Sequence, residues 1–246
     1  MSDIEQYRAS EYERARTADL LRVLPRGRRT VLDVGARDGH FSRLLTEYFD
    51  EVTALDLQKP GFEFTRVVTV AGDITKLAFA TDAFDCVFCA EVLEHIPDVT
   101  RACQEIIRVA KHEIVIGVPY RQDIRCGRTT CSSCGKINPP WGHVNFFDED
   151  HLSGLFSGLP TISRSFVGIT KEATNPISTL LMDLAGNPWG TYEQDEPCIH
   201  CGAKLVAPEG RRIWQRVCST MAVSLNRVQA VWTRPRGNWI HLVYLK

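Results

Sequence analysis

The chain has 246 residues, of which 44% are hydrophobic and 24% charged, and its formal net charge at pH 7 is -1. These values are typical of a soluble globular protein with a substantial core, and they favour one large domain. The near-neutral charge disfavours a polyanionic partner such as nucleic acid. The start of the chain lacks the basic-then-apolar pattern of a signal peptide, and no stretch is apolar enough to span a bilayer, so we expect a cytoplasmic protein.

The first half of the chain predicts alternating strands and helices. An amphipathic helix over 11–24, ended by Pro25, precedes a strand at 30–34, a glycine-containing turn and a second helix. Further strands are expected at 51–56, 66–70, 84–89 and 113–119, with a helix over 93–110 before the last of them. Five alternating units imply an α/β fold, with a doubly wound and mostly parallel sheet.

The second half of the chain interrupts this alternation. Residues 120–143 are rich in Cys, Gly, Pro and Arg, and they lack an apolar period. After them we expect a helix over 149–156, a strand over 161–169, a second irregular stretch, a helix carrying apolar residues from 213 to 228, and a final strand over 239–245. The expected organisation is a single domain over 1–246, with insertions at 121–147 and 187–206 and a helical insertion at 207–238.

The turn after the first strand has features of a nucleotide-binding loop. In an open α/β sheet, ligands bind beyond the carboxyl ends of the strands. Gly35 and Gly39 remove side chains that would keep a ligand from the backbone, and Asp56, at the end of the next strand, is placed to accept hydrogen bonds from a ribose. These features alone also suit a nicotinamide cofactor.

Three details favour S-adenosylmethionine over a dinucleotide. Asp33 places a carboxylate at the entrance of the turn, where it suits the cationic amino group of a methionine moiety and would repel a pyrophosphate. Asp73, in Gly72-Asp73-Ile74, offers a carboxylate to an adenine amino group after the third strand. The segment 90–97, Ala-Glu-Val-Leu-Glu-His-Ile-Pro, then follows the fourth strand.

Taken in order, these segments resemble class I S-adenosylmethionine-dependent methyltransferases of the group that includes the ubiquinone- and menaquinone-biosynthesis enzymes. Residues 31–41 resemble the family's first motif, 77–86 its L-x-F-x-x-x-x-F-D stretch, and 91–97 its E-V-L-E-H-I-P segment. The resemblance covers about the first half of the chain and implies a Rossmann-like sheet with an antiparallel final strand. Arg37 departs from the pattern, since it stands where the family often has the middle glycine.

The resemblance also implies roles for individual residues. Asp33, Gly35 and Gly39 would hold the methionine part, Asp56 the ribose, and Asp73 with Ile74 the adenine. Glu91 would flank the sulfonium. Ala36 and Leu57 complete the expected cofactor-binding set. On the residues alone, Asp56 and Asp73 fit equally well as helix caps or solvated loop residues.

Two matched cysteine pairs predict a structural zinc site. Cys131 and Cys134, like Cys198 and Cys201, form Cys-x-x-Cys-Gly knuckles, and two knuckles supply the four thiolates of a tetrahedral Zn²⁺. A closed shell of four sulfurs leaves no position for substrate, so we expect no catalytic role for the metal. The alternatives are a redox dithiol or buried thiols. Substitute ligands would be Cys126, His143 and His200.

Methyl transfer from a sulfonium is an in-line displacement, so positioning the nucleophile is the main requirement. A hydroxyl nucleophile gains from a general base with a pKa near neutrality, which favours histidine. His143, after the fifth strand, is the first candidate, and His95 in the fourth-strand motif is the second. The structural alternative for His143 is a hydrogen bond to a loop or support of the zinc shell.

The last part of the chain, residues 205–246, bears on the identity of the acceptor. After Lys204, six arginines stand against the single acid Glu209, and such a basic face would suit a phosphate or simply be a solvated helix surface. We expect O-methylation of a small molecule or glycan that is phosphorylated or nucleotide-linked. The rival functions are an RNA methyltransferase, which would grip RNA with the zinc and basic insertions, and a non-catalytic interaction module of the same fold.

Overall fold

The computed structural model describes residues 10–194 and 196–246, and the chain divides into two compact units. The first unit contains residues 10–120, 147–168 and 237–246. The second unit contains residues 121–146 and 169–236. The two Cys-x-x-Cys knuckles and the predicted helix over 213–228 therefore belong to the second unit, and the glycine turn after the first strand belongs to the first unit.

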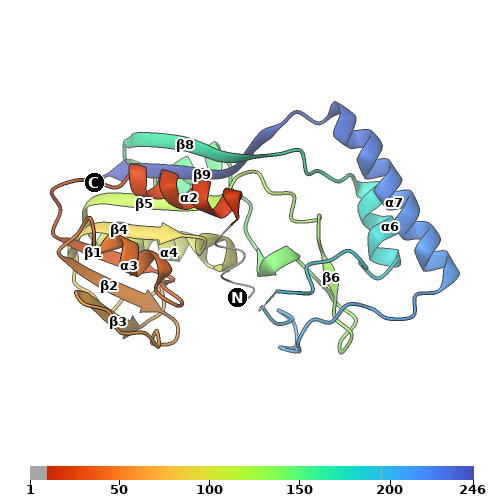
Figure 1. Cartoon of the computed structure of the whole chain (residues 1–246), viewed down its shortest axis with the longest axis horizontal. Helices are drawn as coiled ribbons and strands as arrows, with labels where there is room; N and C mark the ends of the chain where they lie inside the picture. Colours follow the sequence, from red (N-terminus) through yellow and green to blue (C-terminus); the bar gives the residue numbers. More distant parts are fainter. Residues whose placement is uncertain (1–9, 195) are drawn as a thin grey trace. The chain divides into compact units, whose positions relative to one another are not determined.

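The first unit is built on a seven-stranded sheet with the order β3-β2-β1-β4-β5-β9-β8 (Figure 1). Strands β1 to β5 pair in parallel, and β9 pairs antiparallel to β5. The predicted mostly parallel, doubly wound sheet with an antiparallel last strand is therefore confirmed. The strands are β1 (Thr30–Val34), β2 (Glu51–Asp56), β3 (Val67–Ala71), β4 (Phe84–Ala90), β5 (Ala110–Pro119), β8 (Thr161–Thr170) and β9 (Arg236–Leu245).

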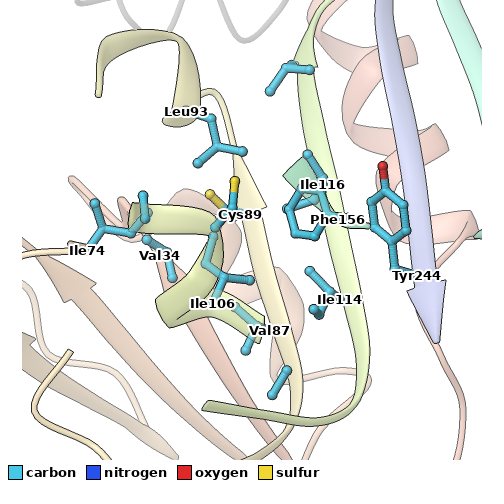
Figure 2. Packing of buried hydrophobic residues seen from close by; sticks show 14 of the residues in the cluster. Val34, Ile74, Val87, Cys89, Leu93, Ile106, Ile114, Ile116, Phe156 and Tyr244 are labelled. Carbon is cyan, nitrogen blue, oxygen red and sulfur yellow. The ribbon is translucent and has the colours of Figure 1, made fainter. Parts of the chain in front are cut away.

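Apolar side chains on both faces of the sheet form the core. Leu32 and Val34 of β1 point to one cluster and Val31 to another, because successive side chains on a strand face opposite sides. The first cluster includes Ile106 and Phe156, and Figure 2 shows Phe156 beside Tyr244 of β9, where the two rings stack with centroids 4.4 Å apart. Burial on both faces explains the nearly continuous apolar sequences of β4 and of residues 114–119 in β5.

The helices of the first unit are α2 (Glu11–Arg22), α3 (His40–Leu45), the short 3₁₀ helix η1 (Leu93–His95), α4 (Val99–Val109) and α5 (Glu149–Leu155). The helix expected over 93–110 is interrupted. Pro97 disfavours helical backbone at Ile96, so η1 ends there, and α4 starts afresh with Asp98 accepting the N–H of Arg101 as its cap.

The second unit has little regular structure apart from two helices. It contains the short strands β6 (Thr129–Thr130) and β7 (Ile137–Asn138), the turn η2 (Pro140–Gly142), and the helices α6 (Pro176–Leu184) and α7 (Ile213–Trp232). The sequence did not predict α6, which begins with a capping box between Asn175 and Ser178. Among residues 10–194 and 196–246, we find no helix that is both long and apolar enough to span a bilayer.

Candidate functional site

The turn between β1 and α3 is closely packed against neighbouring strand ends. Gly35 and Gly39 adopt φ values of +77° and +81°, a left-handed conformation that favours glycine. The N–H groups of Gly35 and Ala36 donate to the carbonyl of Leu55 at 2.8 and 3.0 Å, which ties the turn to the end of β2. A Cβ atom at Gly35 would collide with Val92. The left-handed backbone therefore favours glycine at both positions, and at Gly35 a side chain would also displace Val92.

Asp33 is a buried acid at the end of β1. Its carboxylate accepts a hydrogen bond from the Ser42 hydroxyl at 2.5 Å. Burial raises the pKa of Asp33 to about 7, although the Ser42 hydrogen bond acts in the opposite direction. A cation bound beside Asp33 would favour its charged form, so this carboxyl is suited to an ammonium group.

Asp56 is the last residue of β2 and Asp73 follows β3, and these two strands are parallel neighbours. Asp56 accepts the N–H of Arg37 at 2.9 Å and that of Leu57 at 2.7 Å. Asp73 accepts the N–H and the hydroxyl of Thr75, both at 2.8 Å, and these bonds lower the pKa of Asp73. Asp56 thus joins the loops after β1 and β2, Asp73 makes a local turn contact, and each carboxylate has further lone pairs for a ligand.

Glu91, directly after β4, lies beside two buried charged residues of α2, Arg16 and Glu13, a grouping that the sequence did not predict. It adopts φ +58°, and its carboxylate lies 3.5 Å from the guanidinium of Arg16 in α2. Arg16 is itself buried and donates to Glu13 at 2.9 and 2.6 Å. Burial raises the pKa of Glu91, while Arg16 lowers it. The available signal was a charged pair three residues apart on the apolar face of the first helix.

Glu94 was also overlooked, although it belongs to the fourth-strand motif. It is fully buried in η1, and neither carboxyl oxygen has a hydrogen-bond partner in the described part of the chain. Burial raises the pKa of Glu94 well above its usual value, because desolvation disfavours the charged carboxylate. His95, the next residue, is half-buried. A buried carboxyl without a partner at a strand end is unusual and points to a bound polar group.

The four knuckle cysteines come together in the second unit. The Sγ atoms of Cys131 and Cys201 lie 3.7 Å apart, as do those of Cys134 and Cys198, and all four lie within 4.8 Å of one another. Four thiolates around a tetrahedral zinc, with Zn–S bonds near 2.3 Å, require S–S separations of about 3.8 Å. The cluster therefore has the dimensions of a four-sulfur metal site.

The two knuckles share one backbone geometry. Gly135 and Gly202 both adopt φ +71° and donate to the carbonyls of Cys131 and Cys198 at 2.9 and 2.8 Å. The N–H groups of Cys134 and Ser133 lower the pKa of the Cys131 thiol. The proposed substitute ligands bond elsewhere: Cys126 to Glu172, His200 to the carbonyl of Ile137, and His143 to Gln122.

His143, the first candidate base, is buried in the second unit. Its Nδ1 lies 2.5 Å from Oε1 of Gln122. A ring proton on Nδ1 would donate to this oxygen, and Nε2 would then be the basic nitrogen of the ring.

The second unit also contains two adjoining cavities. One, of about 350 Å³, is lined by apolar groups including Met182, Trp189 and Val223, and by Asn226, whose Oδ1 is buried without a hydrogen-bond partner among the described residues. The other, of about 710 Å³, is lined by four arginines, residues 121, 125, 128 and 236. Ion pairs with Asp123 and Asp183 hold Arg125 and Arg128 in place. The second lining also includes the acids Asp123 and Glu172. The size and the apolar lining of the first cavity are typical of small-molecule sites.

Comparison with known proteins concerns mainly the first unit. Residues 32–115 match a family model described as a methyltransferase domain. The ubiquinone biosynthesis O-methyltransferase of Proteus mirabilis is 33% identical over 95 residues, which are 33% of this chain and 39% of that enzyme. The chain spans about two fifths or less of the length of the curated relatives that it matches.

Solved structures show the same fold at low sequence identity. The YcgJ protein of Bacillus subtilis superposes with a TM-score of 0.56 at 16% identity, covering 95% of this chain and 98% of that one. The N-methyltransferase NodS of Bradyrhizobium japonicum, solved with S-adenosylhomocysteine, has a TM-score of 0.52 at 20% identity, covering 68% and 85%. Residues 32–115 thus match the model of a methyltransferase domain, and the sheet has the Rossmann-like fold of these solved structures.

Proposed function

We propose that the chain transfers a methyl group from S-adenosylmethionine to a small molecule or glycan. The observation that carries this proposal is the set of carboxyl groups at the ends of β1, β2, β3 and β4 around a left-handed glycine turn. The match of residues 32–115 to a methyltransferase domain supports it. The bound cofactor would supply an electrophilic methyl group on a sulfonium.

The residues at the strand ends fit the parts of this cofactor. Asp33 and the Gly35–Gly39 turn, which includes Ala36, would hold the methionine part, because a buried carboxyl with a pKa of about 7 ionises readily beside an ammonium. Asp56 would accept the ribose hydroxyls beside Leu57, and Asp73 and Ile74 would bind adenine. Glu91 would flank the sulfonium and stabilise its positive charge.

The acceptor that we favour is a phosphorylated small molecule or glycan, methylated on oxygen. The arginine-lined cavity of the second unit offers charge for a phosphate, and the adjoining apolar cavity offers room for the rest of the molecule. His143 would act as general base through Nε2, with Gln122 fixing its tautomer. His95 is the alternative base.

The four-cysteine cluster would bind a structural zinc ion. Asn138 supports this role, because its side-chain oxygen accepts the N–H of Ile199 at 3.0 Å and so links the first knuckle hairpin to the second knuckle. The metal would then fix segments that are more than sixty residues apart in sequence. A closed thiolate shell supplies no catalytic group.

Titration calorimetry with S-adenosylhomocysteine, followed by transfer of labelled methyl groups to an acceptor panel, tests the proposal. We expect binding of the demethylated cofactor and labelling of a phosphorylated hydroxyl compound. Labelling of RNA in a salt-sensitive manner would instead support the RNA methyltransferase. Absence of binding to both S-adenosylmethionine and S-adenosylhomocysteine would support the non-catalytic module.

A further inference from the structure

Helix α7 exposes its large apolar side chains and buries its small ones. Trp214, Val217, Met221, Leu225, Val228 and Trp232 follow one another at intervals of three or four residues, and all are exposed, Trp232 to 83%. Such a spacing places them on one face of the helix. The buried residues of the same helix are Ser219 and Ala222. A helix of a water-soluble core has the opposite arrangement.

Helix α6, which packs beside α7 in Figure 1, follows the same rule. Its exposed residues include Ile177, Leu180 and Leu184, while its buried residues are Ser178 and Thr179. The contacts around the pair are also polar, since Asn175 donates to the Gln229 side chain at 2.8 Å. The pair therefore packs through small and polar groups and presents an apolar exterior, as helices in lipid do.

Positive charge lies at one edge of the exposed apolar surface of α7, where Arg216 is three residues from Ile213 and Arg227 is four residues from Val231, both exposed apolar side chains. Arg216 and Arg227 are eleven residues apart, which is about three helical turns, so they lie on the same side of the helix. Both side chains are exposed. Arg211, Arg212 and Arg234 flank the helix, and no Asp or Glu follows Glu209. An exposed apolar stripe with a basic border is the pattern of helices that lie in the interface of an anionic membrane.

We propose that the α6–α7 pair binds an anionic lipid surface, with α7 lying in the plane of the interface. Its charges favour this partner over a second copy of the chain, because pairing two α7 helices would bring arginines together with no acidic residue on either α7 to balance them. Trp214 and Trp232 lie near the two ends of the helix. Tryptophan is a side chain that is enriched at membrane–water interfaces. The helix would lie on the bilayer without spanning it.

Vesicle flotation with the purified chain tests this proposal. We expect binding to phosphatidylcholine vesicles that contain phosphatidylglycerol, weaker binding to phosphatidylcholine alone, and weakening by salt. Arg216→Gln should lower the affinity about fivefold, because one basic side chain near an anionic surface contributes about 1 kcal/mol. Arg216→Lys should retain the affinity. Brominated acyl chains should quench tryptophan fluorescence, and less so in Trp232→Phe.

Substitutions at two equally exposed valines distinguish binding through the apolar face of α7 from a general effect of an added charge on vesicle binding. Val228 on α7 and Val68 on β3 are both 64% exposed. Val228→Glu should weaken vesicle binding at least about tenfold, through lost apolar burial and added repulsion, whereas Val68→Glu should leave it unchanged. Equal effects of the two substitutions, or no flotation of the unaltered chain, would overturn the proposal. A dimer that Val228→Glu dissociates, without vesicle binding, would assign the face to self-association instead.

Discussion

The carboxylate of Asp56 accepts a hydrogen bond from the backbone N–H of Arg37. Arg37 adopts φ +45°, a left-handed conformation, at a position where similar loops often have glycine. Because the bond uses only the backbone of Arg37, and the side chain is exposed, the loop keeps its shape without a glycine there. Asp56 also accepts the N–H of Leu57, so one carboxylate joins the loops that follow β1 and β2.

This relationship predicts different outcomes for the two residues. Asp56→Ala should weaken S-adenosylhomocysteine binding at least about tenfold, since charge-assisted hydrogen bonds to the ligand and to two backbone amides are lost. Arg37→Gly should change the affinity less than about threefold, because the backbone donor remains. Calorimetry measures both. Asp50→Asn, an exposed acid just before β2, is the control and should bind normally.

The stability cost of a side chain at Gly35 can be compared with the cost at a second glycine that has a similar backbone conformation. Gly35 and Gly27 have similar φ values, +77° and +72°, but a Cβ atom would meet Val92 at Gly35 and nothing within 4 Å at Gly27. Gly27→Ala should cost about 1–2 kcal/mol of unfolding free energy from the left-handed backbone alone. Gly35→Ala should cost about 1–3 kcal/mol more through the collision. Urea denaturation compares them, and equal losses would show that Val92 simply moves aside.

The sequence predicted the elements whose side chains are buried in a regular pattern. Strand β4 is apolar apart from Asp85, residues 114–119 of β5 are apolar, and the turn after β1 carries its own glycines, so local residues determine their structure. Helix α6 escaped prediction because its large apolar residues are exposed and its buried ones are Ser178 and Thr179. A reading that assigns apolar residues to the core cannot find such a helix.

Part of the candidate site depends on contacts that no local pattern reveals. Arg16 and Glu91 are 75 positions apart in the chain, and their proximity follows from the docking of α2 beside the sheet. Glu94 lies inside the fourth-strand motif, yet its distinguishing property is burial without a hydrogen-bond partner among the described residues, which only coordinates reveal. The cysteine knuckles were predictable because each contains its own turn, with glycine at φ +71°.

Removal of a knuckle thiolate should release the metal. Cys198→Ser should lower zinc content from one ion per chain to a small fraction and destabilise the second unit by several kcal/mol, because binding energy at a structural zinc site contributes to folding. Metal analysis and thermal denaturation with and without a chelator measure these effects. Cys218→Ser, on α7 and outside the cluster, is the matched control and should retain zinc. Equal zinc content in both variants would contradict the assignment.

The buried carboxyl of Asp33 predicts how stability depends on pH. Its pKa is about 7 in the folded protein against an ordinary value of 3.8, mainly through burial. The folded state therefore keeps a proton that the unfolded state releases, and stability should fall as pH rises from about 4 to about 7. The full loss is roughly 4 kcal/mol. Asp33→Asn should remove this contribution to the pH dependence. The unfolding free energy of the unaltered chain minus that of the variant, measured in urea titrations, should therefore decrease as pH rises from about 4 to about 7.

The same proton links Asp33 to cofactor binding. If Asp33 holds the ammonium of the methionine part, binding requires its charged form, so the carboxyl must release its proton below pH 7. The affinity for S-adenosylhomocysteine should then fall by up to roughly tenfold per pH unit between pH 7 and pH 5. Asp33→Asn should bind more weakly at pH 7 and show little pH dependence. Ser42→Ala removes the hydrogen bond that stabilises the carboxylate, so its affinity should begin to fall at a higher pH than that of the unaltered chain. Calorimetry from pH 5 to 8 measures all three proteins, and an identical pH profile for Asp33→Asn and the unaltered chain would show that the ammonium lies elsewhere.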